Sequence, residues 1–391
     1  MMRRLLTGCR IFDGTALHDD RDLLVEDGRI VDLPRRGAGS GPAVDERVDL
    51  PADALLVPGF IDHQVNGAGG VLFNRTPTPD AARAIAAAMR PFGTTGLLPT
   101  FITDDRTRMI EACKAAEAAM GAGVLGVHLE GPFLNEARRG VHEPRFVRAP
   151  DDADIDAITA LAGRIAPKDG RVLVTLAPEV VSDAHIRRLV EAGVVVSAGH
   201  TAATAERVDA ALALGVRGFT HLGNAMPPVV NREPGPVGAA MASREAWCAI
   251  IADGHHVHPT LLRAVLAAKP AGKVMLVTDA MDPVGTDATE FELYGQTILR
   301  RGGRLVTTDG TLAGADIDMA ASVRNAVALL GVPLPEALRM ASLYPAAFLG
   351  LDHRLGRLAP GYQADLALVT ERVDVLATWV GGEVAWHNKG A

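Results

Sequence analysis

Eight short apolar segments, most of them followed by an amphipathic stretch, run through the middle of this sequence. The apolar segments occupy residues 59–65, 95–102, 124–129, 172–176, 194–198, 218–222, 248–252 and 274–278. Alanine-rich stretches with helical spacing separate them, as at residues 79–90, 106–120, 184–192 and 203–214. A strand and a helix that alternate in this way predict a parallel sheet covered by helices. Eight such units predict an α/β protein with a (β/α)8, TIM-like barrel.

A doubly wound open sheet is the alternative arrangement for the same alternation of strands and helices. Open sheets that bind dinucleotides carry a glycine-rich fingerprint after the first strand, and no such fingerprint follows residues 59–65. A hydrophobic fraction of 48% with only 4% aromatic residues suits a sheet covered by helices on both faces. The barrel is therefore the favoured fold.

The two ends of the chain have a different pattern from the middle. Residues 3–11 predict a strand, and a hairpin signal follows at Asp27-Gly28. Strand-like segments return after Gly356. We therefore predict one small β-sandwich domain that is built from both termini, with the barrel inserted between its halves. The expected parts are residues 1–57, 58–353 and 354–391.

Composition limits the partners and the compartment of this protein. The chain has 39 Lys and Arg against 47 Asp and Glu, and its net charge of -8 gives no general reason to bind nucleic acid. Its three cysteines (Cys9, Cys113 and Cys248) are far apart and odd in number, which is typical of a reducing cytoplasm. No segment approaches the roughly 20 apolar residues that cross a bilayer. We expect a cytoplasmic protein without a membrane or nucleic-acid partner.

Three side chains that bind metals well follow predicted barrel strands. Glu130 follows the third strand, His200 the fifth and His221 the sixth. Functional groups of (β/α)8 barrels lie at these carboxyl ends of the strands. A glutamate alone suits a salt bridge and a histidine alone suits a hydrogen bond. Together, one carboxylate and two imidazoles predict a Zn²⁺ site with three protein ligands and an open fourth position.

Asp279 follows the eighth strand, at the same end of the predicted barrel. We expect it to act as a general base that takes a proton from the attacking water and later gives it to a leaving amine. A salt bridge at the barrel mouth is the alternative. Gln64 and Asn66 end the first strand, and neutral amides compete poorly with imidazole for Zn²⁺. The sequence therefore predicts a single metal ion per subunit.

Two further histidines are expected to have structural roles. Side chains alternate along a strand, so His63 should point away from the face that Gln64 and Asn66 share. His128 shares a face with Glu130 and should be a hydrogen-bonded residue of the barrel interior.

A second group of residues could hold an anionic substrate. Asn224 and Ala225 closely follow His221, and Arg232 lies a few residues further on. Backbone N–H groups after a strand, together with amide and guanidinium groups, can bind an anion such as phosphate. His142, in the loop after the third strand, could bond a sugar hydroxyl or the scissile carbonyl. From the residues alone, the role of His256 stays open.

Several short motifs resemble those of the N-acetylglucosamine-6-phosphate deacetylase family, a branch of the amidohydrolase superfamily. The matching motifs are PGFID (58–62), HLEGP (128–132), AGHT (198–201), HLGNAM (221–226), REPG (232–235), ADG (252–254) with His256, VTDA (277–280) and LAG (312–314). They follow the family's order across nearly the whole chain. Gly223 departs from the larger residue that the family often has there.

The resemblance implies one divalent metal ion per subunit, most simply Zn²⁺, on Glu130, His200 and His221, with Asp279 as the acid/base residue. It implies substrate contacts from His142, Asn224, Ala225, Arg232, His256 and Ala313. It also implies a homodimer in which Arg232 reaches the neighbouring active site.

The implied reaction is hydrolysis of the acetamide of N-acetyl-D-glucosamine 6-phosphate to D-glucosamine 6-phosphate and acetate, a step of amino-sugar catabolism and cell-wall sugar recycling. The galacto epimer is an alternative substrate, because the two sugars differ only at C4. A cyclic-amide hydrolase is a more remote alternative, since the first strand does not end in a His-x-His motif and no obvious bridging lysine stands at a strand end. A non-catalytic scaffold would have lost the metal and base residues, which are retained here.

Overall fold

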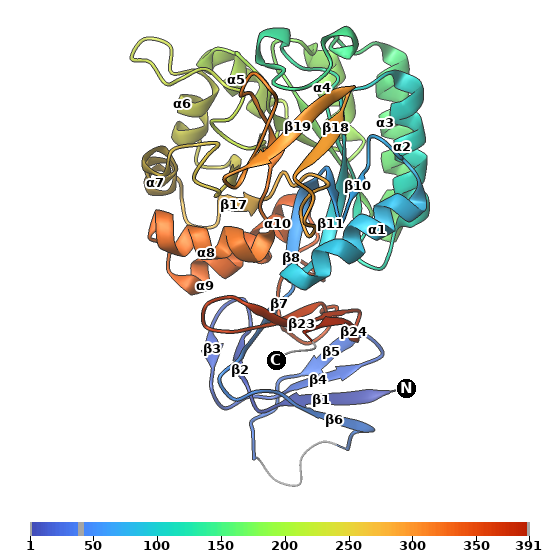
Figure 1. Ribbon diagram of the computed structural model, residues 1–391, viewed down its shortest axis with the longest axis vertical. Coiled ribbons are helices and arrows are strands. Elements are labelled where there is room, and N and C mark those ends of the chain that lie inside the picture. The colour runs from blue at the N-terminus through green and yellow to red at the C-terminus, as the bar shows by residue number, and fades with distance from the viewer. Residues whose placement is uncertain (1, 38–42, 389–391) are drawn as a thin grey trace.

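The computed structural model describes residues 2–37 and 43–388. Eight neighbouring parallel strands form the central barrel (Figure 1). They are β8 (Phe60–Val65), β11 (Thr94–Ile102), β12 (Gly126–Glu130), β13 (Arg171–Leu176), β14 (Val195–Ala198), β15 (Gly218–Phe219), β16 (Trp247–Ile251) and β17 (Val274–Val277). A backbone bridge between Val65 and Ala280 joins the first strand to the end of the last. The predicted (β/α)8 fold is confirmed.

Helices surround the barrel strands on the outside (Figure 1). They are α1 (Pro79–Met89), α2 (Arg106–Ala119), α3 (Asp152–Ile165), α4 (Asp183–Glu191), α5 (Ala205–Ala213), α6 (Gly235–Ala242), α7 (Pro259–Ala268), α8 (Met319–Leu330), α9 (Leu334–Ala341) and α10 (Leu343–Leu349). Most begin after a residue whose side chain accepts a first-turn N–H, as a helix N-cap does. Asp151 and Asp154 form a reciprocal capping box at the start of α3.

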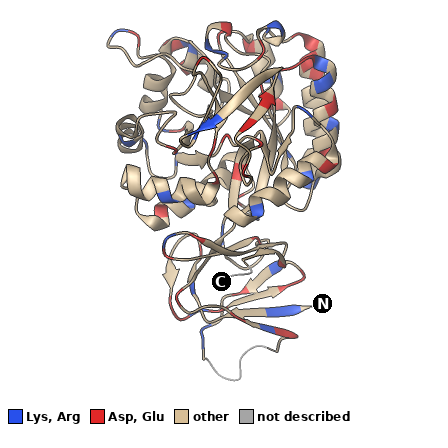
Figure 2. Ribbon diagram, in the orientation of Figure 1, with Lys and Arg blue, Asp and Glu red and all other residues tan. Residues whose placement is uncertain are grey.

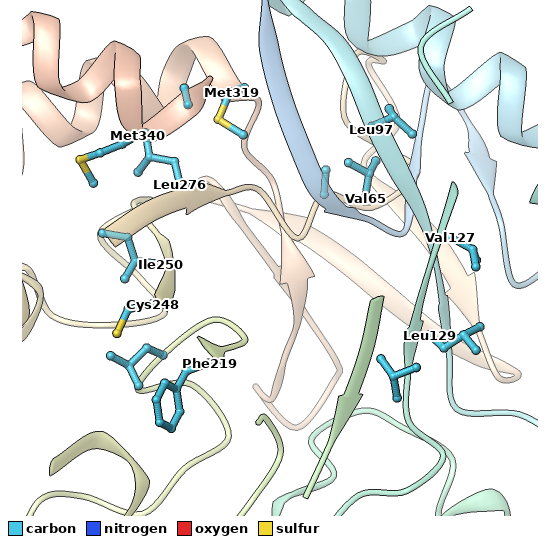
Figure 3. Close-up of a cluster of buried hydrophobic side chains, with 14 of the residues drawn as sticks. Val65, Leu97, Val127, Leu129, Phe219, Cys248, Ile250, Leu276, Met319 and Met340 are labelled. Atoms are coloured by element: carbon cyan, nitrogen blue, oxygen red, sulfur yellow. The ribbon is translucent and has the colours of Figure 1, made fainter. Parts of the chain in front are cut away.

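Apolar side chains fill the space between the barrel strands and the helices. Figure 3 shows part of this cluster, in which Leu276 of β17 lies beside Met319 of α8 and Met340 of α9. Val127 and Leu129 of β12 belong to the same cluster and are fully buried. Burial of this kind contributes roughly 25 cal/mol per Å² of apolar surface. It fixes the strands whose ends carry the site.

Two sheets below the barrel form the β domain (Figure 1). One contains β5 (Arg29–Asp32), β4 (Leu23–Glu26), β1 (Arg3–Thr7) and β6 (Glu46–Asp49). The other contains β24 (Glu383–His387), β23 (Val375–Val380), β22 (Leu366–Val369), β7 (Leu55–Pro58), β2 (Arg10–Phe12) and β3 (Leu17–His18). Leu6, Val25, Leu56, Leu366 and Trp379 share one core. A β domain from both termini is therefore confirmed.

The predicted strand over residues 3–11 was wrong in one respect, because Gly8 divides it into β1 and β2. Gly8 has φ +103, outside the extended region, and a Cβ there would lie 2.5 Å from the Leu50 carbonyl oxygen. Only glycine tolerates this approach of the two backbones. At this break the chain leaves the sheet that contains β1 and enters the sheet that contains β2.

A four-stranded antiparallel insertion follows the eighth barrel strand. It consists of β18 (Glu290–Leu293), β19 (Gln296–Arg301), β20 (Arg304–Val306) and β21 (Leu312–Ala315). Its apolar side packs against Leu72 and Ile102 of the barrel region; Leu72 ends β10 (Val71–Leu72), which pairs with β9 (Gly67–Ala68).

The view in Figure 2 shows basic and acidic residues interspersed along the outer helices rather than gathered into a basic face. Among the described residues, no helix is both long enough and apolar enough to cross a bilayer.

Candidate active site

The ends of three barrel strands bring Glu130, His200 and His221 together. Glu130 is the last residue of β12, and the two histidines lie two residues beyond β14 and β15. The Nε2 atoms of His221 and His200 are 2.9 and 3.2 Å from the same Glu130 oxygen, Oε1. The two Nε2 atoms are 3.1 Å apart. All three side chains are buried.

His200 presents a nitrogen lone pair to this cluster. Its Nδ1 lies 2.9 Å from the carbonyl oxygen of Arg138, which can only accept, so Nδ1 carries the proton. In the neutral ring, Nε2 then presents a lone pair to the Glu130 oxygen. Tetrahedral ligands at metal distances of 2.0–2.1 Å are about 3.3 Å apart, close to the observed separations. The buried Glu/His/His set therefore fits a divalent metal ion.

Glu130 is ionised, and its negative charge also acts on His221. Burial opposes the ionisation of Glu130, but hydrogen bonds and charge from His200 and His221 hold the pKa of this carboxyl well below its usual range. Burial lowers the pKa of His221, but the bond to Glu130 outweighs it and the pKa is raised. Glu130 is thus an anion, as a metal ligand must be.

Gln64 and Asn66 act as hydrogen-bond donors to the two carboxylates of the site. Gln64 Nε2 donates to Glu130 Oε1 at 2.9 Å and to Asp279 Oδ1 at 3.1 Å. Asn66 Nδ2 donates to the same Asp279 oxygen at 2.7 Å. Both amides are buried. They hold the two carboxylates in place and are not themselves among the proposed metal ligands.

Asp279 is a buried carboxyl whose environment favours the protonated form. Burial, followed by the negative charge of Glu130, raises its pKa from 3.8 to about 6. A pKa near the working pH suits a group that both takes and gives a proton. Asp62 lies behind it and accepts hydrogen bonds from the Thr278 hydroxyl and the Gln64 N–H. These bonds fix the turn that carries Asp279.

Four residues around the site adopt the left-handed backbone region that non-glycine residues rarely use. They are His200 (φ 48), His221 (φ 30), Ala225 (φ 53) and Asp279 (φ 55). Such conformations cost about 1–3 kcal/mol each and persist where the surroundings hold them. At His200, His221 and Asp279 the strain occurs where a strand ends and the side chain turns toward the barrel mouth.

A cavity of about 330 Å³ opens beside the cluster. The residues along it that the sequence predicted are Asn66, Glu130, His142, His200, His221, Asn224, Ala225, His256 and Asp279. His142 packs on His200 with ring centroids 4.5 Å apart, and its Nδ1 is 2.8 Å from Thr103 Oγ1. Burial lowers the pKa of His142 to about 3, so the ring is neutral at pH 7. His142 also lies close to two of the proposed metal ligands, because one ligand atom each of Glu130, His142 and His200 lies within 4.8 Å of the other two.

His256 is held by a carboxylate of its own. Its Nδ1 lies 2.5 Å from Asp253 Oδ2, and both side chains are almost completely buried. Because Nδ1 donates to this carboxylate, Nε2 is the atom left to contact a ligand.

Two predicted substrate residues are not among the described residues that line this cavity. Arg232 is exposed on the loop between β15 and α6. Ala313 is fully buried in β21, where its side chain packs with Leu72 and Ile102. Only its neighbours Leu312 and Gly314 line the cavity.

The two structural histidines lie where their strand positions predicted. His63 packs on Phe348, with ring centroids 5.2 Å apart, and is not among the described cavity residues. His128 lies between the hydroxyls of Thr100 (3.0 Å) and Thr175 (2.7 Å) in the barrel interior.

Sequence reasoning missed two residues of the site. Thr103 holds His142, and its position directly after β11 was the signal that could have revealed it. Arg138 lines the cavity, and it precedes His142 by four residues in the loop after Glu130. Arg138 had no such signal, because a loop has no periodicity from which the direction of a side chain can be predicted.

A (β/α)8 barrel with a Glu/His/His set and a second carboxylate at its mouth defines the class of barrel hydrolases with a candidate metal site. Within that class, the chain belongs to the amidohydrolase family, whose model matches residues 55–385.

Three known proteins are similar to this chain over most of its length. An N-acetylgalactosamine-6-phosphate deacetylase of Shewanella sp. (strain ANA-3) is 43% identical over 339 residues, 86% of this chain and 84% of that protein. The crystal structure of an N-acetylglucosamine-6-phosphate deacetylase from Pasteurella multocida matches with a TM-score of 0.93 and 34% identity, covering 99% of this chain and 100% of that one. A mutant Mycobacterium smegmatis enzyme in complex with N-acetyl-D-glucosamine 6-phosphate matches with a TM-score of 0.88 and 34% identity, covering 98% and 100%.

Proposed function

We propose that this protein hydrolyses the acetamide of N-acetyl-D-glucosamine 6-phosphate, an amide hydrolysis that yields D-glucosamine 6-phosphate and acetate in the cytoplasm. The observation that carries the proposal is the arrangement of Glu130, His200 and His221 beside Asp279 at the wall of one cavity. The sequence motifs and the deacetylases among the similar proteins support the choice of substrate class.

The proposed roles follow from the geometry. Glu130, His200 and His221 would hold one divalent ion, for which Zn²⁺ suits the two imidazoles and the carboxylate. When bound, such an ion lowers the pKa of water and polarises a carbonyl. Gln64 and Asn66 both donate to Oδ1 of Asp279, which leaves Oδ2 to take a proton from the attacking water. Asp279 then gives that proton to the leaving amine nitrogen.

The substrate contacts are proposed from the cavity wall. Asn224, Ala225 and His256 would hold the sugar and its phosphate, and His142 would contact the acetamide carbonyl. Ala313 would contribute through its backbone, because its side chain is buried away from the cavity.

Arg232 would act across a homodimer interface. It lies exposed on the same loop as Val229 and Val230, which are 47% and 49% exposed. Apolar side chains on an exposed loop suit a subunit contact. Such a contact would bring the guanidinium to the partner's cavity, since it does not line the cavity of its own chain.

N-acetyl-D-galactosamine 6-phosphate is the second candidate substrate. The 43% identical protein from Shewanella is named for this activity. The two sugars differ at the C4 hydroxyl alone, so both would fit the same metal and base residues. A cyclic-amide hydrolase is less well supported, because Gln64 and Asn66 serve as donors to carboxylates.

An acetate-release assay tests the proposal. The purified protein is given both N-acetylhexosamine 6-phosphates and both unphosphorylated sugars, with and without a chelator. We expect acetate from a phosphorylated sugar, loss of activity with the chelator and recovery with Zn²⁺. The ratio of kcat/KM for the two epimers identifies the preferred substrate. Absence of acetate from all four sugars, with metal bound, would contradict the proposed function.

A further inference from the structure

The guanidinium of Arg138 is an unpaired cation in the wall of the cavity. Arg138 is the last residue of the short helix η2 (Glu136–Arg138), in the loop after β12. Its side chain is half-buried and lines the cavity. Its Nε is buried without a hydrogen-bond partner. Among the described residues that line the cavity, it is the one lysine or arginine.

Nearby arginines differ from Arg138 in this respect. Arg148, further along the same connection, pairs with Asp154, and Arg106 pairs with both Asp151 and Asp154. No described carboxylate lies within ion-pair distance of Arg138. A buried N–H without an acceptor is costly, so a half-buried guanidinium without a protein partner is available to a ligand.

The backbone of Arg138 is tied to the Glu/His/His cluster. Its carbonyl oxygen accepts the Nδ1 proton of His200 at 2.9 Å. A Cβ on Gly140, two residues later, would lie 3.9 Å from the His200 ring. These contacts hold the backbone of the loop at Arg138 beside His200.

The cavity needs a cation to accept an anionic substrate. Glu130 and Asp279 bring carboxylates to its wall. Among the described residues of the wall, Arg138 is the only lysine or arginine that could offset these charges for a phosphate dianion. A guanidinium presents a planar pair of donors that matches phosphate oxygens.

We propose that Arg138 is a substrate-binding residue that pairs with the 6-phosphate of the sugar. This inference rests on the proposed function, and it adds a cation from the chain's own cavity to the contacts described above. It predicts that Arg138 distinguishes phosphorylated from unphosphorylated sugars.

Kinetics of Arg138→Gln in the metal-loaded enzyme test the proposal. We expect kcat/KM for the phosphorylated sugar to fall about 10- to 100-fold, the range for a lost bond to a charged group. The value for the unphosphorylated sugar should stay unchanged. Arg138→Lys, which keeps the charge without the paired donors, should fall between the two. Arg139→Gln is the matched control, since Arg139 is adjacent and not among the described cavity residues.

Two results would overturn the inference. One is an equal loss of kcat/KM for both sugars, which would assign Arg138 to the sugar or to His200 instead. The other is no change for either sugar. Metal content and circular dichroism that match the wild type exclude misfolding as the cause.

A failure of the proposed function can be told apart from a failure of this inference. If the wild type releases no acetate from any sugar, the proposed function is wrong. Calorimetric titration with inorganic phosphate then still tests Arg138 directly. Weaker phosphate binding by Arg138→Gln than by wild type and Arg139→Gln supports the inference, and equal binding refutes it.

Discussion

Replacement of Asn66 by alanine isolates one hydrogen bond to the proposed base. Asn66 Nδ2 donates to Asp279 Oδ1 at 2.7 Å and contacts none of the proposed metal ligands among the described residues. A net hydrogen bond to a charged group contributes about 1.5–3 kcal/mol. One pKa unit corresponds to about 1.4 kcal/mol. Asn66→Ala should therefore raise the pKa of Asp279 by about 1–2 units.

The sign of the effect on activity follows from the role of Asp279 as a carboxylate. Protonation disables a general base, so kcat/KM rises with pH through the pKa of that base. Burial and the charge of Glu130 already raise the pKa of Asp279 to about 6. The variant should have its acid limb shifted a further 1–2 units or so to higher pH. A bound cation lowers the pKa in both proteins, so the difference between them remains.

The assay is acetate release from the phosphorylated sugar between pH 5 and pH 9, in wild type and Asn66→Ala. Asn74→Ala is the control: Asn74 is a buried asparagine that bonds the Ile102 backbone and does not contact Asp279. An acid limb at the wild-type position in Asn66→Ala would refute the reasoning. So would a loss of activity that is the same at every pH.

Two further predictions concern metal binding and stability. Gln64→Ala removes a hydrogen-bond donor to the proposed metal ligand Glu130. Because this donor orients the ligand, metal affinity measured by chelator competition should fall about 10- to 100-fold. An unchanged affinity would count against this prediction. Burial raises the pKa of Asp365 from 3.8 to about 6. Between these values the folded state binds more protons, so wild-type stability should fall by about 3 kcal/mol as pH rises, relative to Asp365→Asn. Urea unfolding between pH 4 and pH 7 measures this, and parallel pH profiles of the two proteins would contradict it.

The barrel could be predicted because its strands are mostly apolar and almost entirely buried. All eight apolar segments coincide with strands to within a few residues. Glu130, His200 and His221 could be found because polar groups directly after buried strands are few, and a barrel gathers those strand ends at one mouth. Gly8 shows the limit: its left-handed φ divides a segment that reads as one strand.

The walls of the cavity could not be predicted in the same way. Arg138 lines it from a loop, and Thr103 bonds the cavity residue His142 from another. The paths of loops depend on tertiary contacts and not on periodicity. Ala313 was predicted to contact the substrate from its position in a sequence motif. Its side chain instead packs in the apolar core beneath the insertion. The role predicted for Arg232 requires a second subunit. Both remain predictions.

Turnover by Asp279→Asn tests the central claim most directly, because this change keeps the size of the side chain and removes the base. We expect that the variant keeps its metal and binds the phosphorylated sugar, but releases no acetate above background. Near-normal acetate release by Asp279→Asn would show that Asp279 is not the base.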